Sequence, residues 1–416
     1  MTETTALAPH AAEPRPRLVS MDQFRGYTVA GMFVVNFLGG YAAVHPVLKH
    51  NNNYFSYADT IMPSFLFICG MSYRLTAVRR REQVGAAAAN RRFALRSLGL
   101  VLLSLMMYGF GEDFPKYAEI SPHSVWEFLA KLVKANLWEV LAIIGVAQLI
   151  TLPVIAAGAG VRALTMFAFA GAHLVMSYYF NFDFVSGRPN ALDGVWGVAG
   201  STAWDGGVFG LLQWSAILLA GTLAYDAASA RTPGRAAARL LFWGGLAMAL
   251  GYVLCGLSTL YDGEPSADRR QTAASPVWPP LQKLSGKTWA DWESVMAEPP
   301  FVEPPPPSTR PHNYWMMNKR IVSLPFVAFS AGFASFLYGL FVLACDPGGR
   351  GVGLFRTFGQ NALAAYVIHS MVEKQIHTIV PSDSPLWYCL VGLSVFYAIT
   401  YLFVRYLETQ RVYIKL

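Results

Sequence analysis

The chain has 416 residues, of which 54% are hydrophobic and only 14% are charged, and its mean hydropathy is +0.36. These values exclude an ordinary soluble globular domain and predict an integral membrane protein. The formal net charge is +7, but basic and aromatic residues do not interleave along a soluble face, so we expect no nucleic-acid binding.

Apolar stretches long enough to cross a bilayer recur along the chain. A spanning helix needs about 20 residues, and we therefore predict an all-α, polytopic membrane bundle of about ten transmembrane helices. Their approximate ranges are 21–42, 58–78, 93–111, 137–157, 161–180, 207–227, 237–258, 321–344, 354–372 and 386–407. Residues 1–17 are rich in Pro and Ala and lack an apolar core, so we expect a disordered cytoplasmic tail ahead of one membrane domain, residues 18–416.

Basic residues determine the predicted orientation. The segments RRREQ, RTPGRAAAR, GGRGVGLFR and RVYIKL fall on one side of the membrane when both termini are assigned to that side. The positive-inside rule makes this side cytoplasmic, and we expect the inner (plasma) membrane. Residues 259–319 then form a Pro-rich external loop between the seventh and eighth helices, where proline prevents long helices. Four tryptophans favour an ordered outer cap over a disordered loop: Trp278, Trp289, Trp292 and Trp315.

The first predicted helix opens with the sequence SMDQFRG. Ser20 can cap this helix, with Gln23 reaching back as in a capping box, and Asp22 suits the positive end of the helix dipole. Arg25 lies one turn from Asp22, so the two can pair with each other or bind a third polar group. The sequence leaves both a structural ion pair and a ligand-binding pair open.

Three polar residues stand in or next to the connection between the first two helices. Asn36, in GMFVVNFLGG, is predicted to be a buried amide that binds either another helix or a ligand. Asp59 opens the second helix, and carboxylates at the membrane edge are costly enough to be treated as site candidates. His50 precedes Asp59 by nine residues and can accept a proton near neutral pH, with the carboxylate stabilising its charged form. A solvated loop histidine is the alternative for His50.

Further polar side chains fall within other apolar stretches. Asn361 precedes His369 by eight residues, so the two can share a helix face, and Gln148 lies in the fourth stretch. These residues suggest a polar cavity in the outer half of the bundle, although each taken alone also fits a packing role. On the cytoplasmic side, arginines could bind phosphate groups, or they could simply follow the positive-inside rule. They are Arg74, Arg79, Arg80, Arg81, Arg91, Arg92 and Arg96.

The common motifs of soluble enzymes are missing from the sequence. It contains no Walker loop, no HExxH, and no GxGxxG or GxSxG in a strand-turn-helix context. The four cysteines lie in apolar runs without CxxC spacing, and we expect packing roles for them and no bound metal. They are Cys69, Cys255, Cys345 and Cys389.

Four segments together resemble a known family. RLVSMDQFRGYTVAGMFVVNFLGG, KHNNNYFSYADTIMPSFLFICGMS, IIGVAQL and GQNALAAYVIH are similar, in order, to the membrane domain of the heparan-alpha-glucosaminide N-acetyltransferase family, which is related to the broader transmembrane acyltransferases. The resemblance places His50 at the family's active-site histidine, Asn36 at a nearby polar residue and Asp59 at the aspartate that opens the second helix. Other family motif positions are occupied by Asp22, Arg25, Asn361 and His369.

The resemblance implies a membrane-bound N- or O-acetyltransferase that moves an acetyl group from cytoplasmic acetyl-CoA to an amino sugar or other glycan acceptor on the outer face. His50 would act as a general base or as a transiently acylated nucleophile, with Asn36 or Asn361 stabilising the oxyanion. Acetyl-CoA, the glycan acceptor and membrane lipids are the expected partners. A homodimer is among the oligomeric states that the sequence leaves open.

Two other classes of function remain at this point. Buried Asp, Asn and His side chains also line the paths of transporters, so a permease for a small polar or sugar substrate, coupled to protons or not, is the main alternative. The other is a protein that holds a lipid-linked glycan without chemistry. A transporter would favour interrupted helices in two related halves, and the sequence shows no such repeat.

Overall fold

The computed structural model describes residues 18–114, 116–229, 232–285 and 295–414. The predicted tail, residues 1–17, and the tryptophans Trp289 and Trp292 lie outside the described residues. Within the described ranges the chain is helical, and strand-type pairing is limited to two isolated bridges between residues 266 and 312. The prediction of an all-α fold is therefore confirmed.

The long helices are α1 (Val19–Gly39), α2 (Ala58–Val84), α3 (Ala86–Tyr108), α6 (Ala159–Met176), α9 (Gly207–Ser229), α10 (Pro233–Gly256), α11 (Leu324–Cys345), α13 (Ala362–His377) and α14 (Leu386–Thr409). The shorter helices are α4 (Pro122–Lys131), α5 (Val140–Thr151), α7 (Phe182–Ser186), α8 (Asp193–Trp196) and α12 (Gly353–Gln360). The remaining turns are η1 (Pro46–Leu48), η2 (Tyr117–Glu119), η3 (Leu132–Asn136), η4 (Ser177–Asn181), η5 (Leu257–Tyr261) and η6 (Leu281–Leu284).

Among the described residues, six helices are long and apolar enough to cross a membrane, or seven if the bent pair of α4–η3 and α5 is one span. The six are α2, α6 with its continuation to Ser186, α9, α10 with its continuation to Tyr261, α11 and α14. The predicted count of about ten is not confirmed. The fourth predicted stretch gives only the 12-residue helix α5, and the ninth is broken at Asn361 into α12 and α13.

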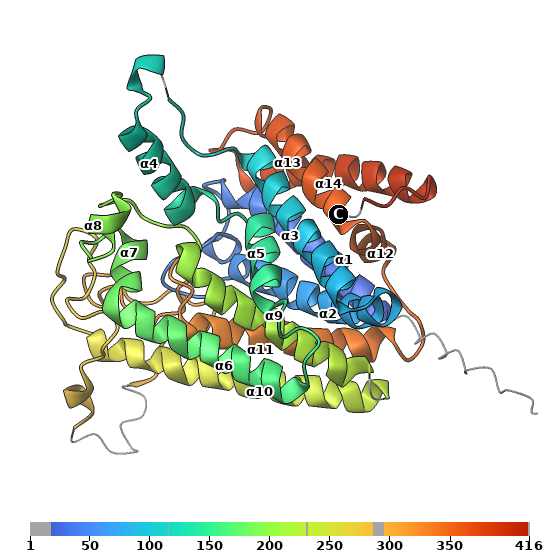
Figure 1. Cartoon of the computed structure of the whole chain (residues 1–416), viewed down its shortest axis with the longest axis horizontal. Helices are drawn as coiled ribbons and strands as arrows, with labels where there is room; N and C mark the ends of the chain where they lie inside the picture. Colours follow the sequence, from blue (N-terminus) through green and yellow to red (C-terminus); the bar gives the residue numbers. More distant parts are fainter. Residues whose placement is uncertain (1–17, 115, 230–231, 286–294, 415–416) are drawn as a thin grey trace, which may run out of the picture.

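Helices α2 and α9 form the centre of the bundle, between α13 and α14 on one side and α6 and α10 on the other (Figure 1). Glycines let these two backbones touch. A Cβ atom added at Gly70 would overlap the carbonyl oxygen of Leu218, and one added at Gly221 would overlap that of Phe67. Because membrane helices associate through close packing of small residues, this reciprocal contact fixes the position of the helix that carries Asp59.

We expect Gly221→Ala to lower the melting temperature of the protein in detergent, because its methyl group would force α9 away from α2. Overpacking of this kind costs typically about 1–3 kcal/mol. Gly245→Ala in α10 is the matched control, since a Cβ there meets open space and the substitution gains about 1 kcal/mol of helix propensity. Thermal unfolding of the two purified variants should therefore shift in opposite directions. Equal shifts would show that the α2–α9 contact is looser than described.

A buried ion pair holds the chain where it bends by 89° between α4–η3 and α5. The ammonium group of Lys134, in the π-helical turn η3, donates to Asp193 Oδ1 at 2.8 Å and to the carbonyl oxygen of Val198 at 3.2 Å. The same group lies 4.2 Å from the ring centre of Phe184. Both charged side chains are almost fully buried, so each depends on the other for its charge to be tolerated.

The described part of residues 258–319 forms a packed cap over one end of the bundle. Tyr314 and Trp315 belong to a separate hydrophobic core that also contains Phe182 at the end of the α6 segment. The Trp315 indole donates to the carbonyl oxygen of Val277 at 2.9 Å, and the backbone N–H of Leu324 donates to the Tyr314 hydroxyl at 3.2 Å. Prolines exclude long helices here, but aromatic packing supplies the order. The side of the membrane on which the cap lies stays a prediction.

Candidate functional site

His50 and Asp59 form a hydrogen-bonded contact at the end of α2 that faces the cap. Asp59 lies in the first turn of α2 and is almost fully buried, and its Oδ1 lies 3.1 Å from His50 Nδ1. Asp59 Oδ2 accepts hydrogen bonds from the Ser56 hydroxyl at 2.8 Å and from the backbone N–H groups of Ser56 and Asn51 at 3.3 and 3.4 Å. An ionised carboxylate only accepts, so Nδ1 of His50 carries the proton of this contact. Nε2 is then the ring nitrogen available to a ligand.

His50 opens onto a cavity of about 610 Å³ between the α1–α2 connection and the cap. Its imidazole is 38% exposed, whereas Asp59 is 1% exposed, which suits a reactive group held by a buried partner. The lining is His50, Asn51, Asn52, Asn53, Phe182, Ser186, Arg270, Thr272, Pro307, His312, Asn318, Arg320 and Ile321. This volume can hold a sugar-sized ligand.

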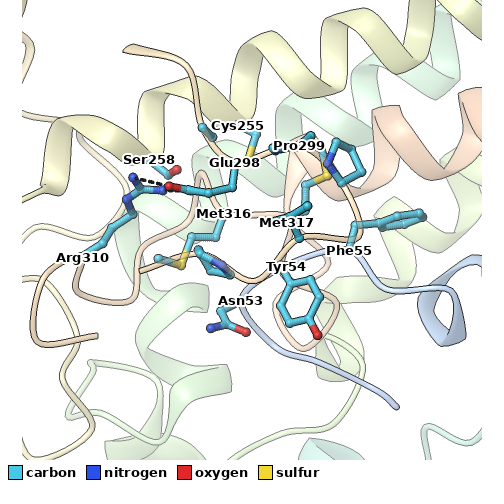
Figure 2. Close-up of a pocket in the computed structure, with 14 residues that line it drawn as sticks. Asn53, Tyr54, Phe55, Cys255, Ser258, Glu298, Pro299, Arg310, Met316 and Met317 are labelled. Atoms are coloured by element: carbon cyan, nitrogen blue, oxygen red, sulfur yellow. Dashed lines mark hydrogen bonds and ion pairs between the residues drawn. The ribbon is translucent and has the colours of Figure 1, made fainter. Parts of the chain in front are cut away.

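The cap also supports the far side of the His50 connection. Figure 2 shows Tyr54 and Phe55 of the connection beside Met316 and Met317 of the cap, around a second, small cavity of about 20 Å³. The backbone N–H of Phe301 donates to the carbonyl oxygen of Phe55 at 2.8 Å. The cap therefore packs against the part of this connection that follows His50.

A second charged pair, which the sequence reasoning missed, lies near His50. Asp205 precedes α9 and Lys319 ends the cap, and their Oδ1 and Nζ atoms are 3.4 Å apart. Both side chains are buried. Burial raises the pKa of Asp205, while Lys319 and His50 lower it and Asp59 raises it, so these groups share one electrostatic environment. Asp205 could have been found by the rule used for Asp59, because it too is a carboxylate at the edge of an apolar stretch.

Asn36 and His369 meet in a different polar group, between α1 and α13. Asn36 Nδ2 lies 3.5 Å from His369 Nε2, and the His369 ring stacks on Phe33 with centroids 5.2 Å apart. Asn36 is exposed, so the prediction that its amide is buried is wrong. Glu373 lies 4.0 Å from His369 Nε2 and 3.5 Å from His377 Nε2. Within the described ranges, no hydrogen bond or ion pair joins Asn36 or His369 to His50 or Asp59.

Asn361 and Gln148 have structural partners. The Asn361 amide donates to the carbonyl oxygen of Val412 at 3.0 Å and its Oδ1 accepts from the backbone N–H of Ile414 at 3.1 Å. Asn361 therefore ties the C-terminal segment to the break between α12 and α13, and it shares no continuous helix face with His369. Gln148 accepts from the Ser97 hydroxyl at 3.3 Å, between α5 and α3.

The opening of α1 packs against the α11–α12 connection. Arg25 lies 3.3 Å from Asp22 and donates to the Ser72 hydroxyl at 2.6 Å and to the carbonyl oxygen of Gly359 at 3.1 Å. The predicted capping box is wrong, because the N-cap is Leu18. The Ser20 hydroxyl instead donates to Asp346 at 2.8 Å. A carboxylate that is distant in the sequence thus takes the place of the local backbone N–H as its partner.

Arg74 lies toward the other end of α2 from Asp59. It pairs with Asp226 of α9 at 3.1 Å and donates to the carbonyl oxygen of Ile155 at 2.7 Å. The fully buried Arg162 of α6 binds the same carboxylate. Fifteen residues of α2 separate Asp59 from Arg74, a rise of about 22 Å, so the two predicted ends of the site are far apart.

The family comparison identifies the membrane domain. A family model described as "Heparan-alpha-glucosaminide N-acetyltransferase, catalytic" matches residues 17–252. The match contains Asn36, His50, Asp59 and Asp205, whereas the cap and Lys319 lie beyond it. None of the curated proteins matches the chain. Within residues 18–114, 116–229, 232–285 and 295–414, no group of three His, Cys, Asp or Glu side chains is placed to hold a metal ion.

Proposed function

We propose, from the premise that this chain belongs to the heparan-alpha-glucosaminide N-acetyltransferase family, that it transfers an acetyl group from cytoplasmic acetyl-CoA to an amino sugar or other glycan acceptor on the outer face of the membrane. Membership implies a transmembrane acetyltransferase, and the family in general uses acetyl-CoA as donor. The acceptor, the sidedness and the residues that act belong to the proposal.

The contact between His50 and Asp59 at the wall of the 610 Å³ cavity is the observation that carries this proposal. Asp59 fixes the ring so that Nε2 is free to accept a proton from the acceptor amine or hydroxyl. The acceptor atom then attacks the thioester carbonyl, the carbon–sulfur bond breaks, and the imidazolium returns its proton to the departing CoA thiolate. In the alternative mechanism, Nε2 attacks the thioester first, the carbon–sulfur bond breaks and CoA departs as the thiolate. The acetyl group then passes from Nε2 to the acceptor, which regenerates the imidazole.

Asn36 is the better candidate for the oxyanion donor. The Asn361 amide is already bound to the C-terminal backbone, whereas the only side-chain contact described for the exposed Asn36 amide is the 3.5 Å one with His369. One positioned donor contributes roughly 3 kcal/mol to transition-state stabilisation in enzymes where it has been measured. This assignment requires the acetyl group to reach the outer half of α1.

The donor would enter from the opposite end of α2. In this proposal both termini and the α2–α3 turn lie on the cytoplasmic side of the plasma membrane, an orientation that the basic segments support through the positive-inside rule. Arg79, Arg80, Arg91 and Arg92 near that turn supply positive charge for the phosphates of CoA, while Arg74 is held by Asp226. The roughly 22 Å between Asp59 and Arg74 along α2 suits an extended donor that reaches from one face toward the other.

We expect acetyl-CoA to raise the melting temperature of the purified protein, because a ligand that binds only the folded state stabilises it, by about 2.7 kcal/mol at 100 times its Kd. In proteoliposomes, labelled acetyl groups should pass to glucosamine when donor and acceptor occupy opposite sides. Adenosine 3′,5′-bisphosphate, which keeps phosphates of CoA but lacks the thioester arm, is the control for simple charge binding. A folded protein that shows neither the shift nor the transfer would instead favour the transporter class.

A further inference from the structure

The cap supplies positive charge to the cavity that His50 lines. Arg270 and Arg320 both belong to the lining, and none of the lining residues is acidic. Arg270 donates to the carbonyl oxygen of Ser186 and, at 3.3 Å, to that of Gly200. These neutral acceptors hold the side chain in place without cancelling its charge.

In the part of the chain that the structure describes, Arg320 has fewer hydrogen-bond partners than Arg270. Its Nε atom is buried and has no hydrogen-bond partner among the described residues, and its guanidinium lies 5.9 Å from the ring centre of Trp204. Asp205, the carboxylate whose charge acts on Arg320, already pairs with Lys319. A buried donor without a partner costs free energy that a bound acceptor would recover.

The electrostatics of the cavity agree with this description. Burial lowers the pKa of Arg320, and the charge of Arg270 lowers it further, against the opposing effect of Asp205. Burial and Arg320 also lower the pKa of His312, which lines the same cavity, against the opposing effect of Asp268. The cavity is therefore electropositive, and a bound anion would relieve the repulsion.

We propose that Arg320, assisted by Arg270, forms an oxyanion-binding subsite in the acceptor cavity, so that the acceptor is an amino sugar bearing a carboxylate, sulfate or phosphate group. This inference rests on the proposed function and deepens it. Both arginines lie in the chain beyond the family match, which ends at residue 252, so the subsite is a property of this chain's cap. The oxyanion binds Arg320 while the amine of the same sugar reaches His50.

Steady-state acetyl transfer by the full chain tests the subsite with four acceptors: glucosamine, glucosamine 6-phosphate, glucosamine 6-sulfate and muramic acid. Wild type should have a kcat/KM at least about 10-fold higher for the anionic sugar that fits than for glucosamine. Comparing phosphate, sulfate and carboxylate identifies which oxyanion the subsite takes. Arg320→Gln should reduce the ratio of anionic to neutral kcat/KM by about 10- to 100-fold, and Arg320→Lys should restore part of it because the charge remains.

Arg269→Gln is the matched control, because Arg269 is an exposed arginine of the same segment that does not line the cavity; its ratio should equal that of wild type. Equal use of neutral and anionic sugars by wild type, or an equal loss of kcat/KM for both in Arg320→Gln, would overturn the subsite.

If no acceptor is acetylated, the proposed function fails, but a thermal-shift measurement of ligand binding still tests the subsite. Glucosamine 6-phosphate should then stabilise wild type more than glucosamine does, and Arg320→Gln should lose that difference; an unchanged difference would contradict the inference.

Discussion

Replacing His50 with alanine should lower acetyl transfer by about 10²- to 10⁴-fold, the contribution typical of a positioned general base. The change removes the only ring nitrogen that the Asp59 contact leaves available in the 610 Å³ cavity. Folding should survive, because the side chain is 38% exposed and contributes little packing. Single-turnover assays with saturating acetyl-CoA measure the loss, and the melting temperature reports folding.

His45→Ala is the matched control, since His45 is an exposed histidine of the same connection whose Nδ1 only accepts from the backbone N–H of Val47. Its turnover should stay close to wild type.

Asp59→Asn should reduce turnover and also stability, because Asp59 binds the backbone of Ser56 and Asn51. An acetyl label retained by wild type without acceptor, and missing from His50→Ala, would identify a nucleophile. Near-normal turnover by His50→Ala would refute the assigned role.

Asp193→Ala should cost about 3–5 kcal/mol of stability, the range seen when one partner of a buried ion pair is removed. The substitution leaves the fully buried ammonium group of Lys134 with only the carbonyl oxygen of Val198 and the ring of Phe184 as partners. Thermal or denaturant unfolding in a fixed detergent measures the effect.

The chain supplies a nearby control for this prediction. Lys131 and Glu112 form an exposed pair at 3.0 Å, and Glu112→Ala should cost at most about 1 kcal/mol. Combining Lys134→Met with Asp193→Leu should recover most of the lost stability, because no charge remains buried. If the double variant is as unstable as Asp193→Ala, packing around the pair and not its charge is what matters.

Hydropathy located the membrane helices better than it counted them. Six of the ten predicted stretches coincide with helices that are long and apolar enough to span: those at 58–78, 161–180, 207–227, 237–258, 321–344 and 386–407. Of the other four, 21–42 and 93–111 form the long helices α1 and α3, which are not apolar enough to be candidate spans, and 137–157 gives only the short helix α5. The run 354–372 is interrupted, because Asn361 leaves helical geometry to bind residues 412 and 414. A window of consecutive residues cannot detect a partner some 50 positions away.

The sequence predicted the pairing of His50 with Asp59 because both stand in one short connection, and the structure places them 3.1 Å apart; their catalytic roles stay predictions. Lys319 and Arg320 come to this site only through the return of the chain after the cap. Nothing near them in sequence distinguishes them from ordinary residues at a helix entrance. Asn36 was correctly singled out as polar within an apolar run, but its exposure depends on where α13 lies, which its own helix does not encode.

Three polar partners of α1 lie near the end of the chain, so these contacts can form only late in synthesis. Ser20 binds Asp346, Arg25 binds the carbonyl oxygen of Gly359, and Asn36 contacts His369. The two residues of these pairs are 326, 334 and 333 positions apart, respectively. At 5–20 residues per second, the ribosome needs roughly 15–65 s to produce them. During that interval the charge of Arg25 has a nascent-chain partner one turn away, Asp22, at 3.3 Å. This local pair gives the charge of Arg25 a partner before the helices that will enclose α1 are synthesised.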